Sequence, residues 1–347
     1  MDPNVVLPLC SSLLSFVFFA FLIDQWRTRR RPYQLVWAVG MLWYALSAGT
    51  EFLGGVFGWS DPLYRAWYLI GAIWVAGWLG LGTVLLLGRT RFGYAFAFSV
   101  LLAGLFTFLS FQKYQYPNSG SAGLIYFAVG LVMAVVIVVM TWRGDDRWPV
   151  VAAALVVGGS AISVVMIVTA QLAPGSYVNA VTHIPEGTLL PGYLRLLTPF
   201  FNVTGAFALG LGALYSAYMF MPKRRVIAYT LEPGQTVGVR LRNFAVGVVA
   251  VPVNFVASLP QTVVDLVHGR LHSRVPSTIL IAIGATIPAI TSGANRFGET
   301  GAFFVGELLG VVFLFAGFIV SLEVFGEIRI PFTRRVLRTR GTDSVQA

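Results

Sequence analysis

The chain has 347 residues, of which 57% are hydrophobic and only 11% are charged. Soluble proteins carry about a quarter charged residues, because most of their surface faces water. The net charge of +10 would suggest nucleic acid as the partner of a soluble protein. Here the basic residues flank apolar runs, where they orient membrane helices and meet anionic lipid. We therefore expect an all-α, polytopic membrane protein that binds no nucleic acid.

Seven apolar runs follow one another from the N-terminus, each long enough to cross a hydrocarbon core of roughly 30 Å. They cover residues 5–23, 35–57, 64–87, 94–111, 124–142, 150–171 and 193–225. No basic region precedes the first run and no small-residue cleavage site follows it, so we expect a retained helix rather than a signal peptide. The basic loop at 27–31 is cytoplasmic by the positive-inside rule, which places the N-terminus outside.

The second part of the chain is less regular. Residues 243–267 are apolar but contain Pro252 and Pro260, and both flanks are basic. A single crossing would place one basic flank outside, so we expect an interfacial or re-entrant amphipathic segment on the cytoplasmic side. Two further crossings are predicted at about 278–290 and 301–325.

These assignments give nine transmembrane helices, with the N-terminus outside and the C-terminus in the cytoplasm. Twenty of the 24 Lys and Arg residues then lie on the cytoplasmic side, which is the bias that the positive-inside rule requires. The predicted parts are a seven-helix unit (1–225), an amphipathic segment (226–274), a two-helix hairpin (275–328) and a basic tail (329–347).

The third and seventh runs resemble each other. When they are aligned without gaps, Arg195 falls on Arg65, and the Leu-Gly-Leu-Gly sequences at 79–82 and 209–212 coincide. A parallel 3+1+3 repeat, as in some small transporters, would produce this match. Close packing of membrane helices over small residues would also produce it, so both interpretations stay open.

Five charged residues are predicted in the outer third of the membrane. Glu51 and Glu307 lie at similar depth, and Arg65, Arg195 and Arg296 lie at helix entries on the same side. Charged side chains at membrane depth are costly and mark candidate functional sites. They indicate a polar vestibule in which the arginines hold an anion or a glutamate carries a proton or cation. The alternative is that the glutamates pair with the arginines and only join helices.

Three uncharged residues complete the candidate ligand-binding set. Asn202 follows Pro199, which frees a backbone carbonyl and makes a notch in the seventh helix. Trp74 and Trp78 lie one turn apart, deeper than the interfacial aromatic residues, and are candidates to line a pocket.

Motifs for catalysis and cofactors are missing from the sequence. There is no phosphate-binding Gly-rich loop with Lys-Ser/Thr, no HExxH and no GxSxG. Cys10 is the only cysteine, which excludes disulfides within the chain and cysteine-based metal sites. The pair His268 and His272 has only Asp265 as an obvious further ligand. We expect no cofactor, no metal and no catalytic residue, and an enzyme is the least favoured class.

The stretches AWYLIGAIWVAGWLGLGTVLLL (66–87) and YLRLLTPFFNVTGAFALGLGALYS (193–216), within a seven-helix unit, resemble the membrane region at the N-terminus of some bacterial sensor kinases. The resemblance covers residues 5–225 and implies a sensing role in a bacterial-type plasma membrane. In that family a cytoplasmic output domain follows, whereas two more helices follow here.

Three functions stay open at this point. The first is a non-catalytic membrane module that senses a ligand or binds a protein partner. The second is a transporter of a small solute or ion that uses the outer vestibule. The third is a structural subunit of a larger membrane complex, or a homo-oligomer, since faces rich in Gly and Ala suit partner helices.

Overall fold

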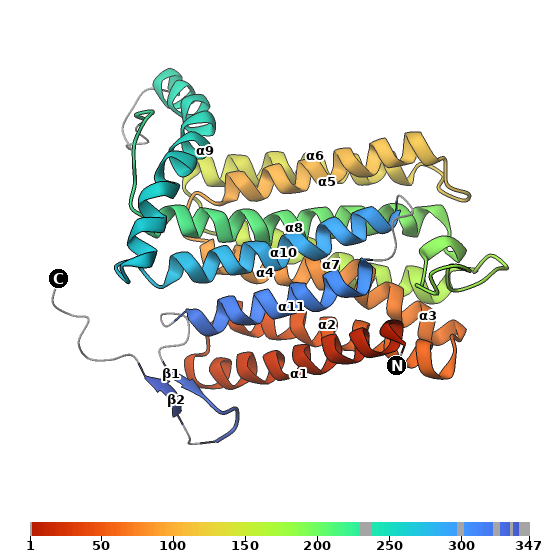
Figure 1. Ribbon diagram of the computed structural model, residues 1–347. Coiled ribbons are helices and arrows are strands. Elements are labelled where there is room, and N and C mark those ends of the chain that lie inside the picture. The colour runs from red at the N-terminus through yellow and green to blue at the C-terminus, as the bar shows by residue number, and fades with distance from the viewer. Residues whose placement is uncertain (1, 230–236, 297–301, 322–326, 334–335, 340–347) are drawn as a thin grey trace.

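The computed structural model describes residues 2–229, 237–296, 302–321, 327–333 and 336–339. Figure 1 shows a bundle of long, nearly parallel helices with one helix, α9, lying across one end. The bundle helices are α1 (Pro3–Arg29), α2 (Pro32–Phe57), the continuous α3–η1–α4 (Asp61–Trp67, Tyr68–Trp74 and Val75–Leu87), α5 (Gly93–Tyr114), α6 (Ala122–Arg143), α7 (Trp148–Thr169), α8 (Gly192–Phe220), α10 (Arg274–Arg296) and α11 (Phe303–Val320).

The helix ends follow from local sequence signals. Asp2 caps α1 by accepting a hydrogen bond from Asn4 N, and proline occupies the first turn of α1, α2, α3 and α7. Proline suits that position because its missing N–H has no partner within the helix anyway. At the other ends, Arg30, Gln115 and Gly144 adopt left-handed conformations that stop α1, α5 and α6.

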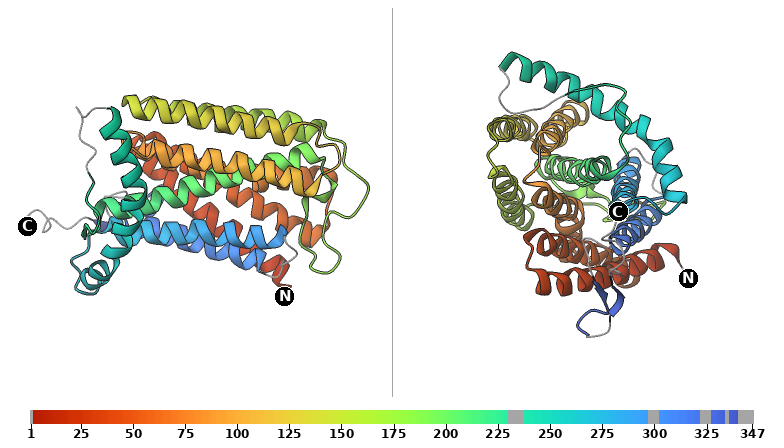
Figure 2. Two further views of the ribbon diagram at one scale, coloured as in Figure 1. Left: turned by 90° about the horizontal axis from the view of Figure 1, so that it is seen from above. Right: turned by 90° about the vertical axis from the view of Figure 1, so that its left-hand side faces the viewer.

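Within the described residues, nine helices are long and apolar enough to cross a membrane. The number agrees with the prediction, but the two sets of nine helices differ in one member. The set includes α9 (Val237–Val267) through its residues 242–267 and leaves out α2. Nevertheless, α2 lies alongside α1 and α4 in the bundle and has the length of its neighbours (Figures 1 and 2).

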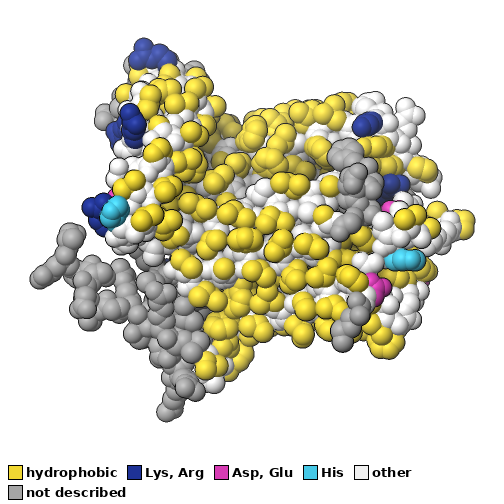
Figure 3. All heavy atoms as spheres, viewed as in Figure 1, with side chains coloured by type: hydrophobic (Ala, Val, Ile, Leu, Met, Phe, Trp, Pro, Cys, Tyr) yellow, Lys and Arg dark blue, Asp and Glu magenta, His cyan; other side chains and the backbone are white. Residues whose placement is uncertain are grey.

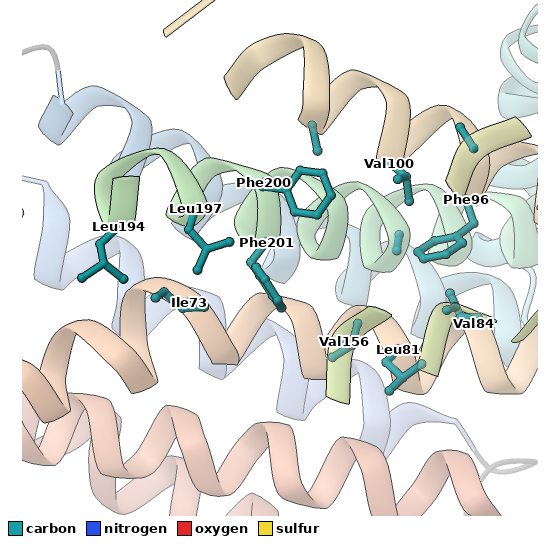
Figure 4. Packing of buried hydrophobic residues seen from close by; sticks show 14 of the residues in the cluster. Ile73, Leu81, Val84, Phe96, Val100, Val156, Leu194, Leu197, Phe200 and Phe201 are labelled. Carbon is teal, nitrogen blue, oxygen red and sulfur yellow. The ribbon is translucent and has the colours of Figure 1, made fainter. Parts of the chain in front are cut away.

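α8 is the central helix of the bundle. It packs against α4, α5 and α10, and Figure 2 shows it surrounded by other helices in the end-on view. The side chains of Phe200 and Phe201 leave it in different directions, Phe200 toward α5 and Phe201 toward α4 (Figure 4). Phe201 fills space left by Gly77 and Gly159, where an added Cβ would lie 3.1 and 2.4 Å from its ring. These rings join α8 to both neighbours.

The surface of the bundle is apolar between its two ends. Figure 3 shows a broad band of hydrophobic side chains, with the charged side chains of this face near the ends. On α6 and α7, Val132 and Val165 are more than half exposed. A soluble protein rarely exposes a continuous apolar surface of this size, so the fold is that expected for a multi-pass membrane protein.

The helix α9 presents its apolar side outward and its polar side inward. Asn254, Ser258 and Thr262 are buried at a spacing of four, whereas Val256 and Val263 are exposed. The Asn254 amide accepts hydrogen bonds from Val226 N and Ile227 N and donates to Ile227 O. The segment before α9 is therefore fixed to its inner side. Burial raises the pKa of Tyr229, at the end of this segment, to about 12.

A structured loop covers the bundle end where the N-terminus lies. It runs from residue 170 to 191 and includes the short helix η2 (Gly187–Leu189). Tyr64 donates a hydrogen bond to Glu186 O at 2.6 Å, and Asn4 donates to Thr182 O at 3.1 Å. Ile184 packs with Phe303 and Phe304 at the start of α11. We call this loop the outer cap, because it joins the ends of α1, α3 and α11 at the end of the bundle that the sequence predicts to lie outside.

Two predicted segments differ in extent from the structure. The eighth crossing, expected at 278–290, is the longer helix α10 (Arg274–Arg296), which continues through Pro288. The ninth ends at Val320 rather than at 325, and residues 322–326 lie outside the described part. Near the C-terminus, β1 (Glu327–Arg329) and β2 (Val336–Thr339) form an antiparallel hairpin, and most of the predicted basic tail is not described.

Candidate functional site

The site begins with one face of α2. Tyr44, Ser47 and Glu51 lie at intervals of three and four residues, which places them on the same side of a helix. Ser47 and Glu51 are buried, and Glu51 is only 2% exposed. This side of α2 points toward α11 and η1, because the Tyr44 hydroxyl donates a hydrogen bond to the backbone carbonyl of Glu307 at 2.8 Å.

The carboxyl groups of Glu51 and Glu307 meet inside the bundle and interact directly. Trp67 donates its indole N–H to Glu51 Oε1 at 2.8 Å and holds that side chain in place. The Oε2 atoms of both glutamates are shielded from solvent, and among the described residues no group outside the carboxyl pair donates a hydrogen bond to them. Buried acceptors without donors are rare in proteins and often indicate an unseen proton, ion or ligand.

A π-helical stretch lies beside this pair. In η1, hydrogen bonds span five residues, as from Val75 N to Ile70 O. The wider turn shifts the residues on either side of it around the helix axis, and such stretches are frequent at functional sites. Trp67 immediately precedes η1, and Gly71 within it lies so close to Ser47 that an added Cβ would be 2.1 Å from Ser47 Oγ. η1 and α2 therefore approach closely at the level of the carboxyl pair.

Next to the pair is a cavity of about 560 Å³, a volume typical of sites for small organic molecules. It lies among α2, η1, α4, α5, α8, α10 and α11, and most of its wall is apolar. The polar groups in the wall belong to Tyr44, Ser47, Asn202, Ser292 and Glu307. Glu51 stands behind Glu307 and does not itself line the cavity.

One side of the cavity reaches the surface of the bundle. Phe106 of α5 and Phe207 of α8 line the cavity and are 42% and 40% exposed. Both lie well inside their helices, away from the ends. The opening is therefore on the apolar flank of the bundle, not at the outer cap.

The predicted vestibule is brought together only in part. Glu51 and Glu307 meet each other, but Arg65 and Arg195 have other partners. Arg65 forms a salt bridge with Asp61 at 3.6 Å and donates to the backbone carbonyl of Ile167, and Arg195 stacks on the ring of Tyr116. Neither arginine neutralises the carboxyl pair. The side chain of Arg296 lies outside the described part of the chain.

The uncharged candidates divide between two places. Asn202 lines the cavity, as does Pro199 one turn before it. Trp74 and Trp78 instead donate hydrogen bonds to Ser163 and Ser160 of α7, at 3.0 and 3.2 Å. They join η1 and α4 to α7 and are not part of the cavity wall.

Sequence reasoning missed four residues of the site, namely Tyr44, Ser47, Trp67 and Gly71. Tyr44 and Ser47 had a signal, because they share a helical face with Glu51. Trp67 and Gly71 had none, since their positions depend on the π-helical turn and no residue type specifies such a turn.

The outer cap has polar contacts of its own. Tyr177 donates a hydrogen bond to Asp61 Oδ1 at 3.0 Å, and this bond raises the pKa of Tyr177 above its usual value. Asp61 also pairs with Arg65, so the cap and the start of α3 form one small network. Among the described residues, no group of three or more His, Cys, Asp or Glu side chains is arranged to hold a metal ion.

Comparisons with known proteins add nothing to these observations. No protein-family description, curated protein or solved structure matches this chain. Functional inference therefore depends on the geometry of the cavity and the carboxyl pair.

Proposed function

We propose that this chain is a non-catalytic membrane protein that binds a small ligand in the cavity beside Glu307 and senses it or presents it to a partner. The observation that carries the proposal is the pair of shielded carboxyl groups next to an apolar cavity of about 560 Å³. Buried carboxyl groups that receive few hydrogen bonds are expensive to maintain, and this pair has a single N–H donor, Trp67, among the described residues. A ligand that supplied hydrogen-bond donors to Glu307 would offset that cost.

Filling the cavity tests this proposal. Gly293 lines the cavity, and a Cβ added there meets nothing within 4 Å, so we expect the larger side chain of Gly293→Leu to reduce the cavity. Gly158 on α7 also has open space around it and lies outside the cavity, which makes Gly158→Leu the matched control. Mass spectrometry of purified protein should find the same small molecule on the wild type and the control. Equal retention by Gly293→Leu would overturn the proposal.

Transport is the second candidate, and the carboxyl pair is the feature that favours it. Two carboxyl groups in contact in a medium of low dielectric cannot both be ionised without a cation, so they tend to share a proton. A pair of this kind is suited to proton coupling. Proton uptake into proteoliposomes that was lost in Glu51→Gln and Glu307→Gln but kept in Asp146→Asn, at the exposed inner loop, would support transport over sensing.

The role of a structural subunit has less support. Several small residues that suggested partner helices face neighbours within the chain, for example Gly80 against Gly205 and Gly284 against Gly310. Assembly into a homo-oligomer, and kinship with the membrane region of sensor kinases, also stay proposals.

The proposed location is a bacterial-type plasma membrane, with the N-terminus outside and the C-terminus in the cytoplasm. The charge distribution of the sequence supports this orientation. We further propose that α9 lies in the cytoplasmic interface, with its exposed valines in the lipid and Arg270 and Arg274 at anionic headgroups. Its crosswise position at the bundle end and its outward apolar side support this placement (Figure 2).

A further inference from the structure

We infer that the ligand of the cavity is a lipophilic cation, with an ammonium head beside Glu307 and an apolar body in the cavity, and that it enters from the bilayer. This inference rests on the proposed function and narrows it to one chemical class. Four features of the site lead to it, namely the acceptors at one end, the charge of the carboxyl pair, the apolar wall and the place of the opening.

The polar end of the cavity is rich in hydrogen-bond acceptors. Glu307 lines the cavity and contributes a carboxyl oxygen to which no group outside the carboxyl pair donates, among the described residues. The Tyr44 hydroxyl donates its hydrogen bond to the Glu307 backbone carbonyl, so its oxygen is left to accept. Ser47 and Asn202 add oxygens that can accept as well, although each side chain can also donate. An ammonium group carries three donors and no acceptor, and it would complement this set better than a carboxylate or a phosphate would.

Charge leads to the same conclusion. Glu51 is fixed as an acceptor by Trp67 and interacts with Glu307, while Arg65 and Arg195 are engaged elsewhere. A cationic head at Glu307 would stabilise the pair in an ionised form, whereas an anion would face two carboxyl groups. Like charges brought together at low dielectric repel strongly.

The rest of the wall selects an apolar body. Leu79, Leu209 and Leu314 line the inner part of the cavity, and Phe106 and Phe207 line its opening. Burying apolar ligand surface against such a wall is favourable by about 25 cal/mol per Å². A small hydrated cation would leave most of this volume without a suitable occupant.

The place of the opening indicates the route. The outer cap covers the bundle end above Glu307, since Ile184 packs on Phe303 and Phe304, one turn before that residue. The exposed rings of Phe106 and Phe207 lie instead on the apolar flank, which would face lipid. A molecule already dissolved in the bilayer reaches the cavity without crossing the cap.

Three probes of equal chain length test the inference, namely dodecylamine, dodecanol and dodecanoic acid. Each is titrated into the full chain in nanodiscs of zwitterionic lipid, and binding is followed by native mass spectrometry and by the shift in thermal unfolding. We expect one bound dodecylamine per chain and roughly tenfold to hundredfold weaker binding of the other two, the range for a charge-assisted hydrogen bond. In Glu307→Gln the preference for the amine should be lost while dodecanol still binds, which shows that the variant is folded.

The outcomes separate the ligand class from the proposed function. If all three probes bind equally and Gly293→Leu abolishes their binding, the cavity is a ligand site but the cationic class is wrong. If Glu307→Gln binds dodecylamine as tightly as the wild type does, the class is also wrong. If neither Gly293→Leu nor the control Gly158→Leu changes the binding of any probe, the probes do not bind in the cavity. Both the proposed ligand site and the proposed cationic class are then overturned.

Discussion

At the scale of single residues, the bond between Trp67 and Glu51 is the most informative one. It joins an indole N–H on α3 to a carboxyl group on α2 that is 2% exposed. An unmet carboxyl group in such surroundings bears its full desolvation cost. The bond therefore stabilises the fold and also fixes the acceptor that stands behind Glu307.

The change Trp67→Phe removes that donor and puts a smaller aromatic ring in the place of the indole. We expect it to lower the free energy of unfolding by about 1–3 kcal/mol, the range for a hydrogen bond to a charged or buried group. Thermal unfolding in detergent measures the loss. Trp74→Phe is the matched control, because its indole bonds to the Ser163 hydroxyl, a neutral partner worth about 0.5–1.5 kcal/mol. Equal losses in the two variants would contradict a special role for the bond to Glu51.

How far the sequence predicted the site can be judged at Glu51 and Glu307. Their depth followed from helix boundaries, because each lies within two turns of an outer end. Their contact did not follow, since the rotation of α2 against α11 depends on packing between residues more than 250 positions apart. The expectation that the vestibule arginines gather around the glutamates reflected the usual cost of an unpaired charge, and here Arg65 and Arg195 take nearer partners.

At the scale of helices, α2 and α9 show why hydropathy alone does not identify which helices cross a membrane. α2 has lower hydropathy because Gln34, Ser47 and Glu51 face the protein interior, where all three are buried. α9 passes a hydropathy test because its valines face outward. Its basic flanks and prolines nevertheless predicted a segment that does not simply cross. That stays a prediction, and the crosswise position of α9 in Figure 1 is the reason to propose it again.

The aligned glycines of the third and seventh helices have different surroundings, which leads to a prediction about α4 and α8. A Cβ on Gly205 would lie 2.1 Å from Ala76 O, in the close contact that Gly80 also makes. Gly210, which aligns with Gly80, has nothing within 4 Å. Gly205→Leu should therefore lower the free energy of unfolding by about 1–3 kcal/mol or more through overpacking.

Gly210→Leu is the control for this change, with an expected effect within about 0.5 kcal/mol. Unfolding in a series of detergent mixtures would measure both variants. If Gly210→Leu lowered the free energy of unfolding as much as Gly205→Leu does, the open space around Gly210 would be contradicted.

At the scale of the whole molecule, the two ends of the bundle differ, and the side of the membrane that each end faces can be measured. Helices of the bundle alternate in direction, α9 stays at the end opposite the N-terminus, and the outer cap covers the other end (Figures 1 and 2). If α9 lies flat, both of its ends are on one side of the membrane. If it crosses, its ends are on opposite sides and α10 and α11 are reversed.

Cysteine labelling distinguishes these arrangements, because Cys10 is the only native cysteine and Cys10→Ala provides a clean background. Single cysteines at exposed sites would replace Ser121 in the α5–α6 loop, Asp146 in the α6–α7 loop, and Gly238 and His268 near the two ends of α9. In intact cells, a membrane-impermeant maleimide should label only Ser121→Cys, and all four should react after permeabilisation. Labelling of Asp146→Cys instead of Ser121→Cys would invert the orientation. Labelling of His268→Cys but not Gly238→Cys would show that α9 crosses the membrane, since only a crossing separates its two basic flanks.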